Sequence, residues 1–370
     1  CLDLSRAFDS IPHDILLRKL HKLQLPKFFF NLLCSYFKSR SQVVRLNDIL
    51  SDLLLIFFGT PQGGVLSGLL FNIYINSISR LNLNSSISLY CDDISLVTSA
   101  RDPSTLQSLI QNDLNEISVW LKFHFLIPNA NKTNYLLFHN RKRNEYFTEN
   151  ALHLFVNGTQ IERVESLRLL GLFINETLNF SSHCQNIQSK IIPFVFALKR
   201  IRHLITDKTA MNMYFAYVQS RLLYLNVIYQ AAPHYLIEAL QIIQRKALRI
   251  VLKKDWYCSR NELYSINCLP VSQLCEVSSL VLLFKIINNC CKNNVAIRTV
   301  SQIHNFNTRN RSNFAINMTN THLGAQNFYI RSLVSYNKIP MFIRNARSIS
   351  SFKTKVKEFL FKSSVDEQQQ

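Results

Sequence analysis

Residues 88–97, SLYCDDISLV, place two aspartates side by side between two apolar runs. Apolar side chains hold alternate positions on both sides of the pair, namely Ile87, Leu89 and Cys91 before it and Ile94 and Leu96 after it. This period of two is typical of strands with one buried face, so the segment predicts a β-hairpin with Asp92 and Asp93 at its tip. Adjacent carboxylates repel and raise each other's pKa. The tip is therefore either a solvated turn or a place where a cation sits between the two side chains.

The sequence around this hairpin predicts short strands and helices up to about residue 180. We expect strands at 1–9 (CLDLSRAFD, turning at Ser5), 41–48 and 131–138, and helices after Pro12 and after Pro26. Asp102 and Pro103 predict the N-cap and first position of a further helix, whose apolar stripe runs from Leu106 to Leu121. This half of the chain is predicted to be α+β with a mainly antiparallel sheet.

The chain after residue 185 is predicted to be helical and is strongly basic. Residues 209–229 and 234–254 give the clearest helical patterns. Between residues 190 and 254 the only acids are Asp207 and Glu238, and between 301 and 362 Glu358 stands alone against many lysines and arginines. A basic helical module follows from this composition, together with a short disordered tail at 364–370.

The charge of the whole chain points to a polyanionic partner. The 370 residues carry 42 Lys and Arg against 23 Asp and Glu, a formal net charge of +19. Nucleic acid is the first candidate partner and a membrane surface the second. There is no run of about 18 apolar residues of the kind that spans a membrane, and the nine cysteines show no zinc-binding spacing. We expect an intracellular protein of nucleus and cytoplasm that acts without a membrane.

Three aspartates are candidates for a phosphoryl-transfer site. Such a site needs carboxylates that hold two divalent cations close together. Asp3 at a strand end, with Asp92 and Asp93 on the hairpin tip, would supply them if the two strands are neighbours.

Five motifs in order carry a resemblance to a known family. They read LDLSRAFD, TPQGGVLSGLLFNIYIN, YCDD, NANKTNYLLF and LRLLGLFIN, all within residues 1–185. Four of the seven glycines fall in the second motif and its flank, where the backbone must approach something closely. This series resembles the right-hand palm of a reverse transcriptase, most closely that of non-LTR (LINE-type) retrotransposons. A weaker similarity continues into the C-terminal region.

The resemblance implies an enzyme, an RNA-directed DNA polymerase. Asp3 and Asp92 would bind two Mg²⁺ ions, for which Mn²⁺ would substitute, with Asp93 beside them. Lys132 would protonate the leaving pyrophosphate. The implied partners are an RNA template, a DNA primer, the RNA–DNA hybrid and dNTPs, and the oligomeric state stays open.

The same resemblance implies further contacts with substrates. Phe8 would lie under the sugar of the incoming nucleotide and exclude a 2′-OH, although a core aromatic is the alternative. Gln62 and Gly63 would contact the nucleotide, and Leu170 and Gly171 would form the primer-grip hairpin. Basic residues of a thumb would track the duplex backbone: Arg245, Lys246, Arg249 and Lys253.

The implied domains are a palm with residual fingers and the primer grip at 1–185, a thumb-like region at 186–256, a basic, mainly helical C-terminal region of unassigned fold at 257–363, and the tail. The first motif stands at the very start, so we expect a fragment without most of the fingers, with impaired activity. The sequence also departs from the family pattern, with YCDD, PQGGVLSG and AFDSIPHD in place of YADD, PQGSVLGP and AFDTVDH.

Two other functions compete with this interpretation. A decayed retrotransposon remnant would bind nucleic acid without catalysis, although all three aspartates are present. RNA-templated RNA polymerases share the palm, but they favour a glycine at the position of Cys91 and a small or acidic residue at that of Phe8. The bulky ring of Phe8 argues against them.

Overall fold

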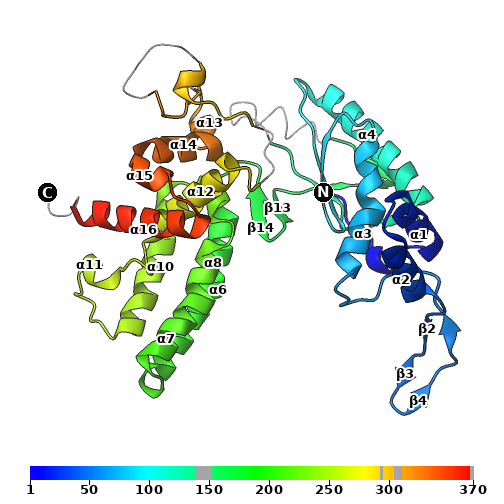
Figure 1. Ribbon diagram of the computed structural model, residues 1–370, viewed down its shortest axis with the longest axis horizontal. Coiled ribbons are helices and arrows are strands. Elements are labelled where there is room, and N and C mark those ends of the chain that lie inside the picture. Colours follow the sequence, from blue (N-terminus) through cyan, green and yellow to red (C-terminus); the bar gives the residue numbers. More distant parts are fainter. Residues whose placement is uncertain (139–151, 292–294, 304–310, 318, 367–370) are drawn as a thin grey trace. The chain divides into compact units, whose positions relative to one another are not determined.

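The computed structural model describes residues 1–138, 152–291, 295–303, 311–317 and 319–366 (Figure 1). The chain divides into two compact units, Cys1–Leu167 and Arg168–Gln370. Among the described residues, no helix is both long enough and apolar enough to cross a membrane.

The first unit combines helices with short paired strands. Its helices are α1 (His13–Lys22), α2 (Lys27–Phe37), α3 (Ser67–Ile75) and α4 (Pro103–Phe123), with 3-10 turns η1 (Ala7–Asp9) and η2 (Asn76–Arg80). Its strands are β1 (Leu4–Ser5), β2 (Ser41–Gln42), β3 (Arg45–Leu46), β4 (Ile49–Leu50), β5 (Leu54–Leu55), β6 (Ser86–Tyr90), β7 (Asp93–Val97), β8 (Ile127–Pro128), β9 (Asn134–Tyr135), β10 (Phe155–Val156), β11 (Thr159–Gln160) and β12 (Glu162–Arg163).

The helices of this unit begin where the sequence predicts. Pro12 and Pro26 directly precede α1 and α2. Asp102 caps α4, because its carboxylate accepts a hydrogen bond from the Thr105 backbone N–H, and Pro103 takes the first helical position, where no N–H is needed. The predicted stripe of α4 reaches the core through its buried leucines and isoleucine, Leu114, Ile117 and Leu121.

The strands pair in two-stranded ladders rather than in one continuous sheet. The predicted hairpin is confirmed as β6 and β7, paired antiparallel from Ser86↔Val97 to Tyr90↔Asp93. Other ladders are antiparallel except for β9 with β12, which is parallel. The predicted strand at 41–48 is divided into β2 and β3, which pair with different partners, β5 and β4.

Residues 41–55 form an arm that extends from the helices of this unit (Figure 1). Two ladders build it in succession, β2 with β5 and β3 with β4. Its valines, leucines and isoleucine are 46% to 75% exposed. We call residues 41–55 the apolar arm.

A buried carboxylate of α4 fixes the start of the β6–β7 hairpin. Asp113 is 1% exposed and accepts hydrogen bonds from the backbone N–H groups of Asn84 (2.9 Å) and Ser85 (2.7 Å). The Asn84 amide and the Ser85 hydroxyl also donate to it. Since charged acceptors form the stronger hydrogen bonds, this side chain ties the hairpin to the long helix.

The second unit is mainly helical. Its paired strands are β14 (Leu172–Asn175) and β13 (Ser166–Leu169), which begins just before the division between the units. Its helices are α6 (Ser181–Ile201), α7 (Asp207–Tyr214), α8 (Ser220–Leu223), α9 (Asn226–Tyr229), α10 (His234–Leu252), α11 (Arg260–Leu263), α12 (Val271–Ile287), α13 (His322–Ala325), α14 (Phe328–Lys338), α15 (Met341–Arg344) and α16 (Ile349–Asp366). Shorter turns are η4 (Arg202–Leu204), the π-type η5 (Phe215–Gln219) and η6 (Val300–Gln302).

Two apolar cores fill this unit. The first gathers α6, α7, α10 and their neighbours, and the second gathers α12, α14, α15 and α16. The predicted helix at 234–254 is confirmed as α10, whereas the one predicted at 209–229 is divided into α7, η5, α8 and α9, with Leu225 at a left-handed φ of 55° before α9. The predicted disordered tail begins inside α16, which continues to Asp366, and residues 367–370 lie outside the described residues.

A buried arginine closes the end of α10. Arg202 is 7% exposed, and its guanidinium donates hydrogen bonds to the carbonyls of Ile250 (3.1 Å) and Val251 (2.7 Å) in the last turn of α10, where carbonyls run short of helical partners. The same guanidinium also binds the exposed carboxylate of Asp207. One side chain therefore joins the region after α6 to the end of α10.

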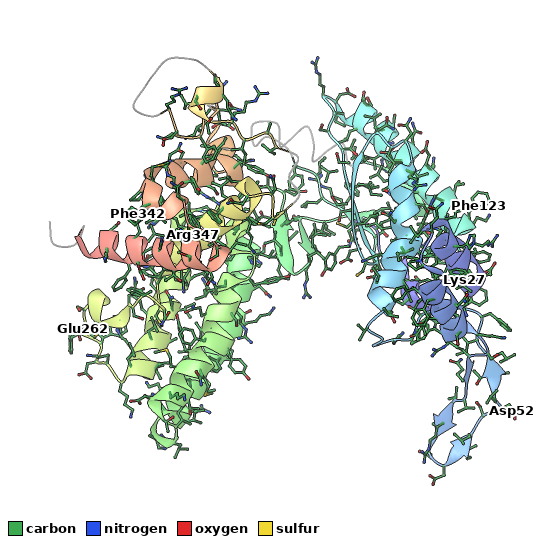
Figure 2. All side chains as sticks on the ribbon, viewed as in Figure 1. Lys27, Asp52, Phe123, Glu262, Phe342 and Arg347 are labelled. Carbon is green, nitrogen blue, oxygen red and sulfur yellow. The ribbon has the colours of Figure 1, made fainter. Side chains whose placement is uncertain are left out.

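We expect Asp113→Ala to lower the free energy of unfolding of the first unit by about 3 kcal/mol, because it leaves buried donors without a charged acceptor. Urea unfolding, followed by the emission of Trp120 in a Trp256→Phe background, measures this. Asp52→Ala removes the same charge from the exposed arm (Figure 2) and should change stability by less than about 0.5 kcal/mol. Equal effects of the two changes would contradict the role of Asp113.

Candidate active site

A short antiparallel bridge places Asp3 beside the hairpin. The Leu2 N–H donates to the Ile94 carbonyl at 2.8 Å, and the Ile94 N–H donates back at 3.3 Å. Leu2 and Leu4 are buried in the core at 4% and 5% exposure. Because side chains alternate along an extended chain, Asp3 between them points to the opposite side. The condition set by the sequence analysis, that the two segments be neighbours, is met at this bridge.

The other two carboxylates lie at the hairpin end, with Asp92 in the turn and Asp93, which was predicted to share the tip, as the first residue of β7. Tyr90 pairs with Asp93, so Cys91 and Asp92 form a two-residue turn, with Cys91 at a left-handed φ of 51°. Asp93 directly precedes Ile94, the residue that bridges to Leu2.

The three carboxylates interact electrostatically. Partial burial raises the pKa of Asp93 above its usual value, and the negative charges of Asp92 and Asp3 raise it further. A cation between these groups would remove that repulsion. Within the described part of the chain, however, no three His, Cys, Asp or Glu side chains are already arranged as a metal-binding group. The carboxylates share one location without forming a preformed ligand cage.

Lys132 lies on a turn that is hydrogen-bonded to the backbone of Asp3. The Asn129 N–H donates to the Asp3 carbonyl at 2.8 Å, and the Asp3 N–H donates to the Thr133 hydroxyl oxygen at 3.3 Å. Thr133 is 2% exposed, and its own hydroxyl donates to the Asn129 carbonyl. Lys132 itself is exposed. The turn thus presents a lysine next to the strand of the first aspartate.

The glycine-rich loop packs on the turn after Asp3. The Thr60 N–H donates to the Phe8 carbonyl at 2.9 Å. The Gln62 amide donates to both carboxylate oxygens of Asp9 at 3.1 Å. Gly59 has a φ of +85°, and a Cβ there would lie 3.1 Å from the Asp9 Cα, so a larger residue would push the two segments apart.

Phe8 and Gly63 occupy different environments in this region. Phe8 is half-buried, and its ring lies 4.7 Å from that of Phe71 in α3. This packing fits both a core aromatic and a residue with one face open to a ligand. Gly63 has a φ of +77° with open space where a Cβ would be, so conformation rather than crowding favours glycine there.

Leu170 and Gly171 form the turn between β13 and β14, as the sequence predicts for a hairpin. Their φ values are +47° and +85°. The hydroxyl of Tyr224 donates to the Leu170 carbonyl at 2.6 Å, and a Cβ on Gly171 would lie 3.2 Å from the Tyr224 ring. The side chain of Tyr224 therefore packs against this turn and fixes it with a hydrogen bond.

The four basic residues predicted to contact nucleic acid differ in exposure. Lys246 and Lys253 are exposed, and Lys253 also lies 3.4 Å from Asp207. Arg249 is half-buried. Arg245 is 9% exposed and donates to Glu238 at 2.8 Å. The burial of Arg245 and its ion pair with Glu238 weigh against a contact of Arg245 with phosphate, so the predicted phosphate contacts rest on the other three residues.

Several residues of these surroundings were not identified from the sequence. Asn129 and Thr133 look like ordinary turn residues, and their bonds to Asp3 come from more than 120 positions away. Asp9 is part of a motif quoted above, yet its pairing with Gln62 depends on loop geometry. Tyr224 gave no local signal at all.

Comparisons with known proteins show which family this chain resembles. Residues 1–174 match the family described as reverse transcriptase (RNA-dependent DNA polymerase). The RNA-directed DNA polymerase from the mobile element jockey of Drosophila melanogaster is 25% identical over 269 residues, which cover 69% of this chain and 28% of that protein.

Two further relatives come from similar elements. The probable RNA-directed DNA polymerase from transposon X-element of Drosophila melanogaster is 24% identical over 71% of this chain and 29% of its own length. The Pol polyprotein from the type-1 retrotransposable element R1 of Bradysia coprophila is 26% identical over 54% of this chain and 19% of its own. The chain thus spans less than a third of these relatives. Over residues 1–174 the chain is thus similar to reverse transcriptases, and these relatives come from mobile elements.

Proposed function

We propose that this chain carries the polymerase core of an RNA-directed DNA polymerase of a non-LTR retrotransposon. It extends a primer 3′-OH with dNTPs on an RNA template. The observation that carries the proposal is the Leu2–Ile94 bridge, which brings Asp3 to the hairpin of Asp92 and Asp93. The reverse transcriptase match over residues 1–174 supports the same reaction.

The donor chemistry of this site fits divalent cations. Carboxylate oxygens are the ligands that Mg²⁺ prefers, and Mn²⁺ accepts them too. Asp3 and Asp92 would hold two ions, with Asp93 beside them. Burial raises the pKa of Asp93, and the charges of Asp92 and Asp3, which the ions would neutralise, raise it further. Bound metal would supply Lewis acidity and charge neutralisation at the reacting phosphate.

The protein's own side chains would position and protonate the substrates. Lys132 is held beside Asp3 by the Asn129–Thr133 turn and would donate a proton to the leaving pyrophosphate. Phe8 would lie against the sugar of the incoming nucleotide. Gln62, oriented by Asp9, would touch nucleotide and template, and Gly63 would allow close approach.

In the second unit, the proposed roles concern the primer and the hybrid. Leu170 and Gly171 would grip the primer end, on a turn held by Tyr224. The exposed Lys246 of α10 and Lys253, which follows it, would contact backbone phosphates of the nucleic acid without reading its sequence. This region would act as a polymerase thumb.

The second candidate function is nucleic-acid binding by a catalytically dead remnant. The chain's charge of +19 suits such binding. The joint presence of three carboxylates at one location favours catalysis instead, because repulsion among them has no use in a protein that only binds.

We expect Asp92→Asn to lower primer extension on poly(rA)·oligo(dT) at least about 100-fold, because a lost carboxylate removes stabilisation that matters in the transition state. Binding of the same hybrid should change less than about twofold, since the basic surface is intact. The assay uses Mg²⁺ and Mn²⁺, on the chain alone and on the chain joined to the part of the jockey protein that precedes the matched region.

Asp52→Asn, on the exposed arm, is the matched control and should extend primers like the wild type. Extension by Asp92→Asn at a tenth of the wild-type rate or more would remove Asp92 from its role. A wild type that binds the hybrid but extends nothing in either form would favour the remnant.

We expect Phe8→Ala to raise the incorporation of ribonucleotides relative to deoxyribonucleotides at least tenfold, about 1.4 kcal/mol of discrimination. Removing the ring opens space for a 2′-OH. The ratio is measured within one preparation, so a change in the folded fraction, which loss of the Phe71 contact can cause, cancels. An unchanged ratio would show that Phe8 serves only the core.

A further inference from the structure

A pocket on the second unit combines an apolar floor with a basic rim. It lies between α6 and α10 and has a volume of about 460 Å³. Isoleucines and a valine from both helices line its floor. Its rim holds four cations and two aromatic side chains: Lys199, Lys246, Arg249, Lys254, Phe196 and Trp256.

The aromatic side of this pocket is open to solvent. Trp256 follows the end of α10 and is 68% exposed, and Phe196 of α6 is 64% exposed. The guanidinium of Arg249 lies 4.8 Å from the centre of the Trp256 ring. The Arg249 Nε atom is buried and makes no hydrogen bond in the described structure. The stacked arginine steadies the indole while leaving much of its surface available.

The charges around the pocket are unbalanced. Lys254 is paired at 3.0 Å with Glu262 of α11, the residue that Figure 2 labels. Among the described residues, none forms an ion pair with Lys199 or Lys246, both of which are exposed. A ligand that suits this pocket therefore carries repeated negative charge and at least one flat, apolar group.

We propose that this pocket binds single-stranded nucleic acid, with an unpaired base stacked on Trp256 and the flanking phosphates near Lys199 and Lys246. In a duplex the base faces are already stacked on one another, so an exposed indole cannot reach them. Base–aromatic stacking with a basic groove is the common physics of single-strand binding. This binding extends the proposed function, because an RNA template has an unpaired portion. It rests on that function only for the statement that the bound strand is the template.

The test measures binding by the full chain, independently of polymerisation. Fluorescence anisotropy compares a labelled oligo(rU) strand of about 12 nucleotides, within the usual span of single-strand sites, with a blunt RNA–DNA hybrid of similar length. Trp256→Ala should weaken oligo(rU) binding at least about fivefold, the lower range for one stacked base. Binding of the hybrid should change less than about twofold, since it offers no free base.

Two control variants separate stacking from damage to the fold. Tyr257→Ala removes the neighbouring aromatic, which is 93% exposed and lies outside the pocket lining, and should leave both affinities unchanged. Trp256→Phe keeps a stacking face and should restore most of the oligo(rU) affinity. Equal losses for strand and hybrid in Trp256→Ala, or no loss for either, would overturn the proposal.

The phosphate contacts have a separate readout. The double change Lys199→Gln with Lys246→Gln should make the slope of log K against log salt for oligo(rU) shallower by about 1.4, because each contact to a single strand releases about 0.7 of a counterion. Lys208→Gln with Lys353→Gln removes two exposed lysines elsewhere and should change the slope much less. Equal changes would mean that the pocket has no special role.

The remaining outcomes also decide the question. If a glutamate-rich amphipathic peptide quenches Trp256 while oligo(rU) does not, the pocket serves a protein partner and the proposal is wrong. If primer extension fails in the wild type while Trp256→Ala still weakens single-strand binding selectively, the proposed function fails and the pocket assignment stands.

Discussion

The antiparallel bridge between Leu2 and Ile94 is the contact on which the candidate site depends. Two backbone hydrogen bonds join segments more than 90 residues apart, and the residues next to them in sequence are Asp3 and Asp93. Backbone pairing is well suited to this task, because its register fixes both position and side-chain direction. The carboxylates are thus brought together against their own repulsion by main-chain bonds and by the burial of leucines and isoleucine around them.

Segments that contribute no carboxylate to the candidate site support this bridge. The turn of Asn129 and Thr133 holds one side of Asp3, and Asp113 holds the base of the hairpin. Thr133 and Asp113 are both buried, and their side-chain oxygen atoms accept hydrogen bonds from specific donors. Losing one member of such a group leaves a buried polar atom without a partner and lowers stability. The site therefore depends on a local hairpin and on hydrogen bonds between residues of the first unit that are far apart in sequence.

Local patterns allowed much of the fold to be predicted, and long-range contacts account for what was missed. Alternation predicted β6 and β7, and proline with an N-cap aspartate predicted α4. The single sheet expected from the strands is replaced by separate ladders, because strand pairing depends on partners that no local window contains. In the site, the metal-binding candidates were found by residue type, whereas Thr133 is recognisable only once the chain has folded. Arg245 looked like its neighbours in sequence, yet the turn of the helix buries it against Glu238.

The apolar arm affects how the chain behaves in solution. Its two-stranded ladders leave one edge of each strand unpaired, and such edges with apolar side chains invite pairing with another copy. The net charge of +19 opposes this at low ionic strength, because like-charged molecules repel over a screening length of about 10 Å at 0.1 M salt. At 1 M that length shrinks to about 3 Å. Concentrated salt removes nucleic acid from a basic protein, but it also screens the repulsion that keeps copies of the chain apart. A salt concentration that improves purity therefore lowers solubility.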